Sequence, residues 1–333
     1  MTAPVSVVVV SWDRRELLLE CLDSLMAQTL RPAEIIVVDN GSTDGTAAAV
    51  TERYGERVRI IRSETNLGFA GGNNLGAAAA TAEWLALLNN DAVADPRWIE
   101  EMMAAAGPGV GLVAGRLLRA ERTELLDNAG VRFWPDGMSR GAFHYFPDAE
   151  VRNPEVVLPS GAAMLVRRAA FNAAGGFDES FFAYSEDTDL SLKVRLLGFS
   201  CAFADGARAY HRGGGGTLGV VSPRKIYLVE KNRLRVLLRY FPAGAIALSP
   251  FWTAVRYAGL AWAMLRGRNN DKAGGGSTLA SLRALYEAYR DFWRGRAADL
   301  AIRRQHCGGP ELIRKLLRSR LDLASLTRLE ADE

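Results

Sequence analysis

The stretch Glu34-Ile-Ile-Val-Val-Asp39-Asn-Gly-Ser-Thr-Asp44-Gly decides the fold of this chain. Its run of β-branched residues predicts a buried strand, and the Asn, Gly, Ser and Asp residues that follow are typical of a turn before a helix. Short apolar runs at 5–10 and 84–88 predict further strands, as does the segment 58–62, and residues 14–28 carry leucines at helical spacing. Because alternating strands and helices need crossover connections, the sequence predicts an α/β fold with a mainly parallel central sheet covered on both faces.

Charge is distributed unevenly along the 333 residues. Residues 1–223 hold 20 basic and 28 acidic residues, whereas residues 224–333 hold 21 basic and 10 acidic residues, a formal charge of +11. The whole chain has a net charge of only +3, which argues against a nucleic-acid partner. We therefore predict two domains, an α/β domain over 1–223 and a basic, aromatic-rich helical extension over 224–333.

The cysteine pattern and the apolar segments indicate the cellular compartment in which the protein works. Three cysteines lie far apart without a Cys-x-x-Cys motif, which argues against a disulfide framework or a thiol-rich zinc site. The N-terminus lacks the basic region and small-residue cleavage site of a secretory signal. Residues 243–265 are long and apolar enough to suggest a membrane span, but Pro250 and Arg256 lie near their middle. These features predict a cytoplasmic protein without a simple transmembrane helix.

Polar side chains follow three predicted strands at their carboxyl ends, where open parallel sheets bind ligands. They are Asp39, the run Asn89-Asn90-Asp91, and His211. Asp39 can accept hydrogen bonds from a ribose hydroxyl or a base N–H. The alternative for Asp39 is a cap on the next helix, a role that Ser42 or Asp44 could fill equally well.

Asp91 and His211 are the candidate metal ligands. Mg²⁺ and Mn²⁺ prefer oxygen ligands and are commonly held by one or two carboxylates together with substrate phosphates. Imidazole is also a common metal ligand. The alternatives are that Asn89-Asn90-Asp91 is a turn and that His211 is a core or surface histidine.

The segment Glu186-Asp187-Thr-Asp189 places three carboxylates at the start of a helix predicted over 187–197. Neighbouring carboxylates raise one another's pKa, which suits a general base that works near neutral pH. The alternative is a solvated helix start whose acidic residues complement the helix dipole.

The segment Asn66-Leu-Gly68-Phe-Ala-Gly-Gly-Asn73 predicts a glycine-rich loop that enters a helix near residue 77. Such a loop could bring backbone N–H groups close to a diphosphate. The alternative is a tight turn, for which Gly68 and Gly71 alone would suffice.

Taken together and in this order, five segments resemble the motifs of the family 2 inverting glycosyltransferases of GT-A fold, the nucleotide-diphospho-sugar transferase fold. They are Val5-Ser-Val-Val-Val-Val-Ser11, Ile36-Val-Val-Asp39-Asn-Gly-Ser-Thr-Asp44-Gly-Thr, Asn66-Leu-Gly-Phe-Ala-Gly-Gly-Asn73, Leu87-Leu-Asn-Asn-Asp91 and Ser185-Glu-Asp-Thr-Asp-Leu190. The resemblance covers roughly residues 5–240. Within the family the chain is most similar to bacterial rhamnosyltransferase-like members that build cell-wall or surface polysaccharides.

The resemblance implies a nucleotide-sugar donor. It places Asp39 at the pyrimidine base or the ribose of the nucleotide. The remaining donor-binding positions that it implies are Asn66, Gly68, Asn73 and Asn90.

The resemblance also implies the reacting groups. Asp91 and His211 would hold Mg²⁺ or Mn²⁺, but Asn89 stands where the family usually has the first Asp of Asp-x-Asp, which removes a charge. Asp187 would be the catalytic base, with Glu186 shaping its field or the acceptor pocket.

The implied activity is a one-step, inverting transfer of a sugar, with dTDP-rhamnose favoured, to a hydroxyl of a glycan or polyprenyl-diphosphate-linked acceptor. One alternative is another donor, such as UDP-Gal or UDP-GlcNAc; a second is a non-catalytic nucleotide-binding scaffold of the same fold. For residues 224–333 we expect a peripheral contact with the inner face of the cell membrane, through aromatic and basic side chains. The alternative for this segment is a homodimer interface.

Overall fold

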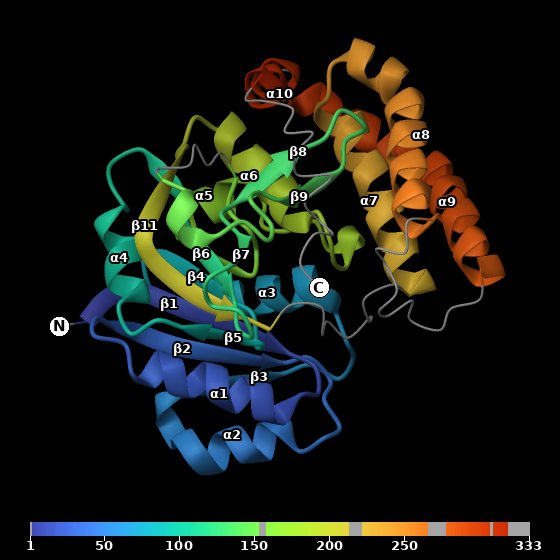
Figure 1. Ribbon diagram of the computed structural model, residues 1–333. Coiled ribbons are helices and arrows are strands. Elements are labelled where there is room, and N and C mark those ends of the chain that lie inside the picture. The colour runs from blue at the N-terminus through green and yellow to red at the C-terminus, as the bar shows by residue number, and fades with distance from the viewer. Residues whose placement is uncertain (1, 153–157, 213–221, 266–277, 307–308, 319–333) are drawn as a thin grey trace. The chain divides into compact units, whose positions relative to one another are not determined.

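The computed structural model describes residues 2–152, 158–212, 222–265, 278–306 and 309–318 (Figure 1). The chain divides into two compact units, residues 1–131 with 141–213, and residues 132–140 with 214–333. The short segment 132–140 therefore groups with the C-terminal helices. The functional boundary expected at residue 223 stays a prediction.

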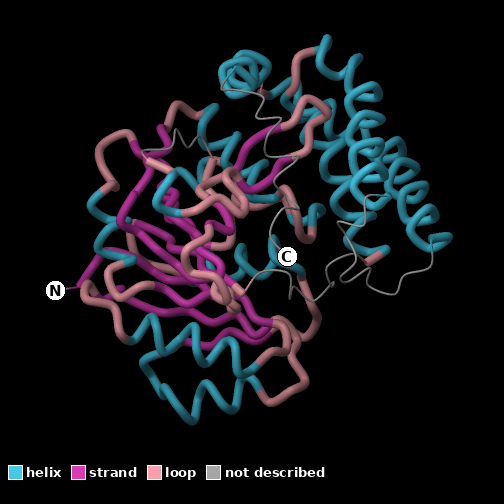
Figure 2. Tube along the Cα trace, in the orientation of Figure 1, coloured by secondary structure: helices cyan, strands magenta, loops and turns pink. Residues whose placement is uncertain are grey.

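The first unit is built on a nine-stranded sheet in the order β3-β2-β1-β4-β10-β6-β11-β5, with β7 beside β6 (magenta in Figure 2). Its strands are β1 (Thr2–Ser11), β2 (Arg31–Asp39), β3 (Arg59–Arg62), β4 (Trp84–Leu88), β5 (Ala92–Ala94), β6 (Val110–Arg119), β7 (Leu126–Asn128), β10 (Ala163–Arg167) and β11 (Ser200–His211). The first four strands pair in parallel. β10 runs antiparallel to β4 and β6, so the second half of the sheet is mixed. The predicted α/β class is confirmed.

Helices cover both faces of this sheet, because alternate residues of the central strands point to opposite sides. Val7 and Val9 of β1 belong to one apolar core together with α1 (Arg15–Met26), α2 (Thr46–Tyr54) and α4 (Trp98–Ala104). Val8 belongs to a second core on the other face, with α3 (Gly68–Ala79), α5 (Arg168–Ala173) and α6 (Glu186–Leu196). Short 3₁₀ turns lie at Gly55–Arg57, Asp148–Glu150 and Glu179–Phe181. The strands are therefore apolar on both faces, as the sequence predicts.

The glycine-rich segment differs from the predicted elements, since helix α3 begins at Gly68 and already contains the glycines expected in a loop. A Cβ atom on Gly72 would lie 2.6 Å from Cγ1 of Val10, and one on Gly76 would overlap the side chain of Val8. These glycines let α3 pack directly against β1. Tertiary packing thus outweighs the poor helix propensity of glycine, which is why the prediction of a loop was wrong.

Among the residues that the structure describes, the second unit contains most of the hairpin of β8 (Val131–Phe133) and β9 (Ser139–Gly141) and four helices. The helices are α7 (Pro223–Tyr240), α8 (Ala243–Leu265), α9 (Thr278–Gln305) and α10 (Gly309–Arg318). The predicted helical character of this segment is confirmed. In the part of the chain that the structure describes, we find no helix of the length and apolarity that crossing a membrane requires.

Candidate active site

Asp39 ends β2 and is almost completely buried, with 1% of its surface exposed. Its Oδ1 accepts a hydrogen bond from Ser42 N at 2.9 Å, and its Oδ2 lies 3.5 Å from Nε of Arg62. The backbone N–H of Thr46, at the start of α2, is bound instead by Asp44 Oδ1 at 3.1 Å. Asp39 therefore shapes the turn after β2, and Asp44 accepts from the first backbone N–H of the next helix.

Asn40 joins the end of β2 to the start of α3. Its Nδ2 donates to Asn66 Oδ1 at 3.1 Å and to Gly68 O at 3.0 Å, and its Oδ1 accepts from Leu67 N at 2.9 Å. The Oδ1 of Asn66 also accepts from Gly68 N at 2.8 Å. Two of the predicted donor-binding residues, Asn66 and Gly68, thus form one network with the residue that follows Asp39.

Asn73 lies apart from this network. Its side chain is buried inside α3 and donates to the carbonyl of Phe69 at 2.9 Å, one turn earlier. The side-chain amide of Asn73 is thus used in a hydrogen bond within α3. A contact between Asn73 and the nucleotide-sugar donor stays a prediction.

The strand order reverses between β1 and β4. A hydrogen bond connects the carboxyl ends of these two strands. Asn90, which follows β4, donates from Nδ2 to the hydroxyl of Ser11 at 3.0 Å. The preceding residue, Asn89, donates its backbone N–H to Ala162 O at 2.9 Å. Ligands of open α/β sheets bind at such a reversal point. Asn90 therefore lies where a nucleotide would be expected.

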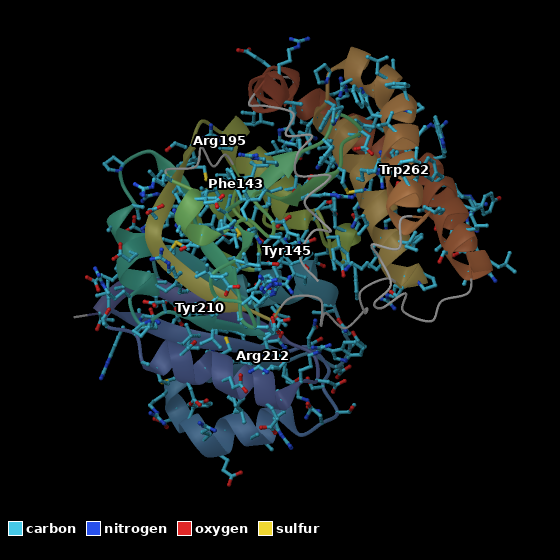
Figure 3. The ribbon with its side chains drawn as sticks, viewed as in Figure 1. Phe143, Tyr145, Arg195, Tyr210, Arg212 and Trp262 are labelled. Atoms are coloured by element: carbon cyan, nitrogen blue, oxygen red, sulfur yellow. The ribbon has the colours of Figure 1, made fainter. Side chains whose placement is uncertain are left out.

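His211, at the end of β11, lies between two carboxylates and contacts both. Its Nε2 lies 3.1 Å from Asp91 Oδ1, and its Nδ1 lies 3.2 Å from Asp127 Oδ2. Burial alone would lower the pKa of the imidazole, but hydrogen bonds and charges from Asp127 and Asp91 outweigh it and raise the pKa to about 10. Burial likewise acts to raise the pKa of Asp91, and His211 reverses this and holds it below its ordinary value. Figure 3 labels Tyr210 and Arg212, which flank His211.

Asp187, in the first turn of α6, is half-buried and held by backbone donors. Its Oδ2 accepts from Gly161 N at 2.9 Å, and its Oδ1 accepts from Thr188 N at 2.7 Å. Burial raises the pKa of Asp187 in spite of these hydrogen bonds. A carboxylate with a raised pKa is a stronger base than one in water.

Glu186 is more deeply buried than Asp187. Burial, followed by the charges of Asp187 and Asp189, raises the pKa of Glu186 well above its ordinary value. Its Oε2 has no hydrogen-bond partner among the residues that the structure describes. Burial and the neighbouring carboxylates therefore disfavour the ionised form of Glu186.

The loop before α6 connects the candidate base with the start of α3. Phe182, Tyr184 and Ser185 all have φ values between 65° and 71°, a left-handed conformation that costs energy for residues other than glycine. The carbonyl of Phe182 accepts from Ala70 N at 3.2 Å and lies so close to Gly68 that any side chain there would overlap it. Backbone strain of this kind is concentrated at functional sites.

The structure therefore brings most of the predicted residues together in the first unit. Adjacent residues of one turn, Gly161 and Ala162, bind Asp187 and Asn89 respectively. Sequence reasoning did not single out Asn40 or Asp127. Asn40 could have been found as part of the quoted motif, whereas Asp127 lies in a three-residue strand that carries no local signal.

The residues after β4 and at the end of β11 offer ligand atoms of the kinds that divalent cations bind. One carboxylate, Asp91, and one imidazole nitrogen, of His211, face each other, and Asn89 Nδ2 lies 3.3 Å from the same nitrogen. No group of three His, Cys, Asp or Glu side chains in the described ranges is arranged to hold a metal by itself. A two-residue donor set is what a cation needs when substrate phosphates supply the other oxygens.

Comparison with known proteins identifies the family. Residues 6–175, just over half of the chain, match the family model described as "Glycosyl transferase family 2", and the chain belongs to this family.

Two curated relatives illustrate the range of proteins in which this domain occurs. N-acetylglucosaminyl-diphospho-decaprenol L-rhamnosyltransferase of Mycobacterium tuberculosis is 32% identical, in a match covering 63% of this chain and 76% of that protein. The O-antigen biosynthesis protein RfbC of Myxococcus xanthus is also 32% identical over 63% of this chain, but the match spans only 17% of that larger protein.

Solved structures agree with the GT-A fold. The mannosyltransferase PcManGT of Pyrobaculum calidifontis, solved with GDP-Man and Mn²⁺, superposes with a TM-score of 0.52 at 17% identity and covers 95% of this chain and 88% of its own. GalNAc-T7, solved with UDP, GalNAc and Mn²⁺, gives a TM-score of 0.58 at 15% identity over 89% of this chain and 57% of its own. The predicted family, fold and enzyme class are thus confirmed.

Proposed function

We propose that this glycosyltransferase moves a sugar, with L-rhamnose from dTDP-rhamnose favoured, to a hydroxyl of a polyprenyl-diphosphate-linked acceptor in cell-wall or surface-polysaccharide synthesis. The observation that carries the proposal is the turn at Gly161 and Ala162. It holds the carboxylate of Asp187 beside the strand end that bears Asn89, Asn90 and Asp91.

The reaction is a one-step displacement that inverts the anomeric carbon. The acceptor hydroxyl oxygen forms a bond to that carbon while the bond from the carbon to the diphosphate oxygen of the donor breaks. The hydroxyl proton passes to Asp187, and the nucleoside diphosphate leaves. Because the diphosphate is a stable anion, no second acid is needed to protonate the leaving group.

The donor is held by groups at the carboxyl ends of the parallel strands. We assign Asp39, at the end of β2, to the ribose or base, and Asn90 lies at the reversal point of the strand order. Asp91 and His211 would hold the cation, and a bound Mg²⁺ or Mn²⁺ would neutralise charge that develops on the diphosphate.

The favoured sugar and acceptor rest on the mycobacterial relative, whose name states an L-rhamnosyl transfer to N-acetylglucosaminyl-diphospho-decaprenol. Purified protein incubated with dTDP-rhamnose, UDP-Gal, UDP-GlcNAc or GDP-Man and a synthetic N-acetylglucosaminyl-diphospho-prenol tests this choice. We expect a glycosylated lipid only with dTDP-rhamnose. A product with another donor alone would replace rhamnose in the proposal.

Asp187→Asn tests the base. The amide keeps the size of the side chain and can still accept a backbone hydrogen bond, but it cannot take a proton. We expect transfer to fall about 10²- to 10⁴-fold while dTDP binding stays within a few-fold. Retained turnover in this variant would assign the proton transfer to another group.

The non-catalytic scaffold is the competing function, and Asn89 supports it because it removes a charge from the metal site. Isothermal titration of dTDP, UDP and GDP with and without Mn²⁺ separates the two functions. An enzyme of the proposed kind binds its nucleotide more tightly in Mn²⁺, whereas a scaffold shows no metal-coupled binding.

The helices of the second unit support peripheral contact with an anionic membrane surface. On α8, Leu248, Phe251 and Val255 are exposed at spacings of three and four residues, and on α9 the same spacing is formed by Leu279, Leu282 and Tyr286. Trp262 on α8, labelled in Figure 3, is 57% exposed. The formal charge of +11 over residues 224–333 complements anionic lipid. We propose such a lipid surface, reached from the cytoplasmic side, as the partner of these helices.

Sedimentation with vesicles tests the membrane contact. We expect binding to vesicles of phosphatidylglycerol and phosphatidylcholine and little binding to phosphatidylcholine alone. Replacing Phe251 and Leu282 together by Ser should weaken binding about tenfold or more, because about 1.5–3 kcal/mol is associated with burying one such side chain. A stable dimer that hides these residues and does not bind vesicles would assign the same surface to self-association.

A further inference from the structure

Asp127 contacts the side of His211 that faces away from Asp91. The Oδ2 atom of Asp127 lies 3.2 Å from His211 Nδ1, while Asp91 Oδ1 lies 3.1 Å from His211 Nε2. The side chains of Asp127 and His211 are only 15% and 14% exposed. The imidazole is therefore fixed through both of its nitrogens within a largely buried cluster.

The sheet sets this arrangement. β7, which carries Asp127, pairs antiparallel with residues 117–118 of β6, and the last residues of β11 pair in parallel with residues 116–119 of the same strand. Both Asp127 and His211 are thus placed against one end of β6. Asp127 lies between the two paired residues of β7, Leu126 and Asn128, at an irregularity in the pairing with β6, while His211 pairs with Arg119.

The backbone of Asp127 is also held. Nδ1 of His144 lies 2.6 Å from the main-chain oxygen of Asp127 and 3.6 Å from its Oδ1. His144 in turn packs on Tyr145, with ring centroids 4.3 Å apart. Tyr145, labelled in Figure 3, also lies under the guanidinium of Arg119 at 4.5 Å. Asp127 therefore has a defined position that does not depend on His211 alone.

We propose that Asp127 is the positioning residue of the cation site: it accepts the Nδ1–H of His211 and so keeps Nε2 of this ring as the nitrogen that faces the cation shared with Asp91. The inference rests on the proposed cation binding by Asp91 and His211. Carboxylates that accept the second N–H of a metal-binding histidine fix both its tautomer and its ring orientation, and their loss typically weakens metal binding 10- to 100-fold.

A purely structural role for Asp127 predicts different results when Asp127 is replaced. If Asp127 only stabilised β7 and the contact with His144, its replacement would lower the melting temperature and would weaken nucleotide binding equally with and without metal. If it acts through His211, the loss appears only when metal is present and disappears when His211 is already replaced.

The experiment measures Mn²⁺ binding by electron paramagnetic resonance in the presence of dTDP, for the full chain and its Asp127→Asn variant. The amide keeps the shape of Asp127 but has no charge, so we expect Mn²⁺ affinity to fall about 10-fold or more. Binding of dTDP in EDTA should be unchanged. In the His211→Gln background, Asp127→Asn should cause no further loss of Mn²⁺ affinity.

Asp148→Asn is the matched control. Asp148 has a similarly buried carboxylate that pairs with Arg116 at 2.7 Å and with Arg208 at 3.0 Å. Its replacement should lower stability and leave Mn²⁺ affinity unchanged. Equal Mn²⁺ affinity in wild type and Asp127→Asn would overturn the inference while leaving the proposed function intact. Absence of any Mn²⁺ binding by the wild type would instead overturn the proposed cation site, and the inference with it.

Discussion

Asp187 and Asn89 are bound by neighbouring residues of one turn, since Gly161 N donates to Asp187 Oδ2 at 2.9 Å and Ala162 O accepts from Asn89 N at 2.9 Å. The candidate base and the strand end that carries Asp91, the candidate metal ligand, are thus held by the same turn. A change in this turn would move the base relative to the donor site. A substitution in this turn therefore tests directly whether the position of Asp187 relative to Asp91 limits the rate of the reaction.

Gly161→Ala makes that change. The added Cβ would lie 3.1 Å from Cβ of Asp187 and 3.1 Å from Cζ of Phe69, which is closer than ordinary van der Waals contact. We expect kcat to fall about 10- to 100-fold, because small displacements of reacting groups cost this much, while donor KM changes only a few-fold. Steady-state kinetics with saturating acceptor measures both values.

Gly295→Ala is the control for this variant. It lies in α9, where an added Cβ would meet nothing within 4 Å. We expect unchanged kcat and a small gain in stability, up to about 1 kcal/mol, from the better helix propensity of alanine. Wild-type kcat in Gly161→Ala would show that the turn does not position the base.

Asp91→Asn tests the role of charge at the metal site. The carboxylate faces His211, and Asn89 already supplies an uncharged side chain next to it. Removing the charge of Asp91 should weaken dTDP binding in Mn²⁺ by about 10-fold or more and leave binding in EDTA unchanged. Isothermal titration under both conditions measures the difference. Asp95→Asn, four residues further along the chain, should bind like the wild type in both buffers; equal binding by Asp91→Asn and wild type in Mn²⁺ would contradict the assignment.

The order of the elements and most of the site were predictable from local patterns. The strands at 5–10, 34–39 and 84–88 are mostly apolar runs, and the polar residues at or just after their carboxyl ends therefore lie at the edge of the sheet. Two features were not predictable. The glycines of α3 are explained by their contacts with Val8 and Val10, and the contact of Asp127 with His211 depends on how β7 and β11 pair with β6. Both depend on residues far apart in the sequence.

Glu186→Gln addresses the pH dependence of stability. Because burial raises the pKa of Glu186 above the unfolded value near 4.5, the folded protein retains a proton that the unfolded chain loses. The contribution of Glu186 to stability is therefore greatest below that unfolded value and declines as pH rises toward the folded pKa. Glutamine cannot ionise, so the melting temperature of Glu186→Gln relative to that of the wild type should rise as the pH increases above 4.5.

Thermal unfolding at several pH values measures this difference, with Glu121→Gln on the exposed surface as the control for loss of one carboxylate. A difference between Glu186→Gln and wild type that stays constant across the range would mean that Glu186 ionises alike in both states.

Arg256→Met tests the buried charges of the second unit. Arg256 donates to Asp136 Oδ2 and to Glu230 Oε1, both at 2.7 Å, and Arg233 pairs with Glu230 at 2.8 Å. All four side chains are buried, so removal of one guanidinium leaves carboxylate charge without its partner in a poorly solvated place. We expect a loss of about 3–5 kcal/mol in the free energy of unfolding, measured by urea denaturation.

The exposed pair of Arg283 and Glu287 on α9 is the matched control, because the guanidinium of Arg283 is 79% exposed and its ion pair is screened by water. Arg283→Met should cost less than about 1 kcal/mol. Adding Glu230→Gln to Arg256→Met removes one of the carboxylate charges that lose their partner. The loss of stability in the double variant should therefore be smaller than the sum of the losses in the two single variants. Equal losses for Arg256→Met and Arg283→Met, or strict additivity in the double variant, would mean that Arg256 is held by packing of its alkyl chain, with its charge contributing little.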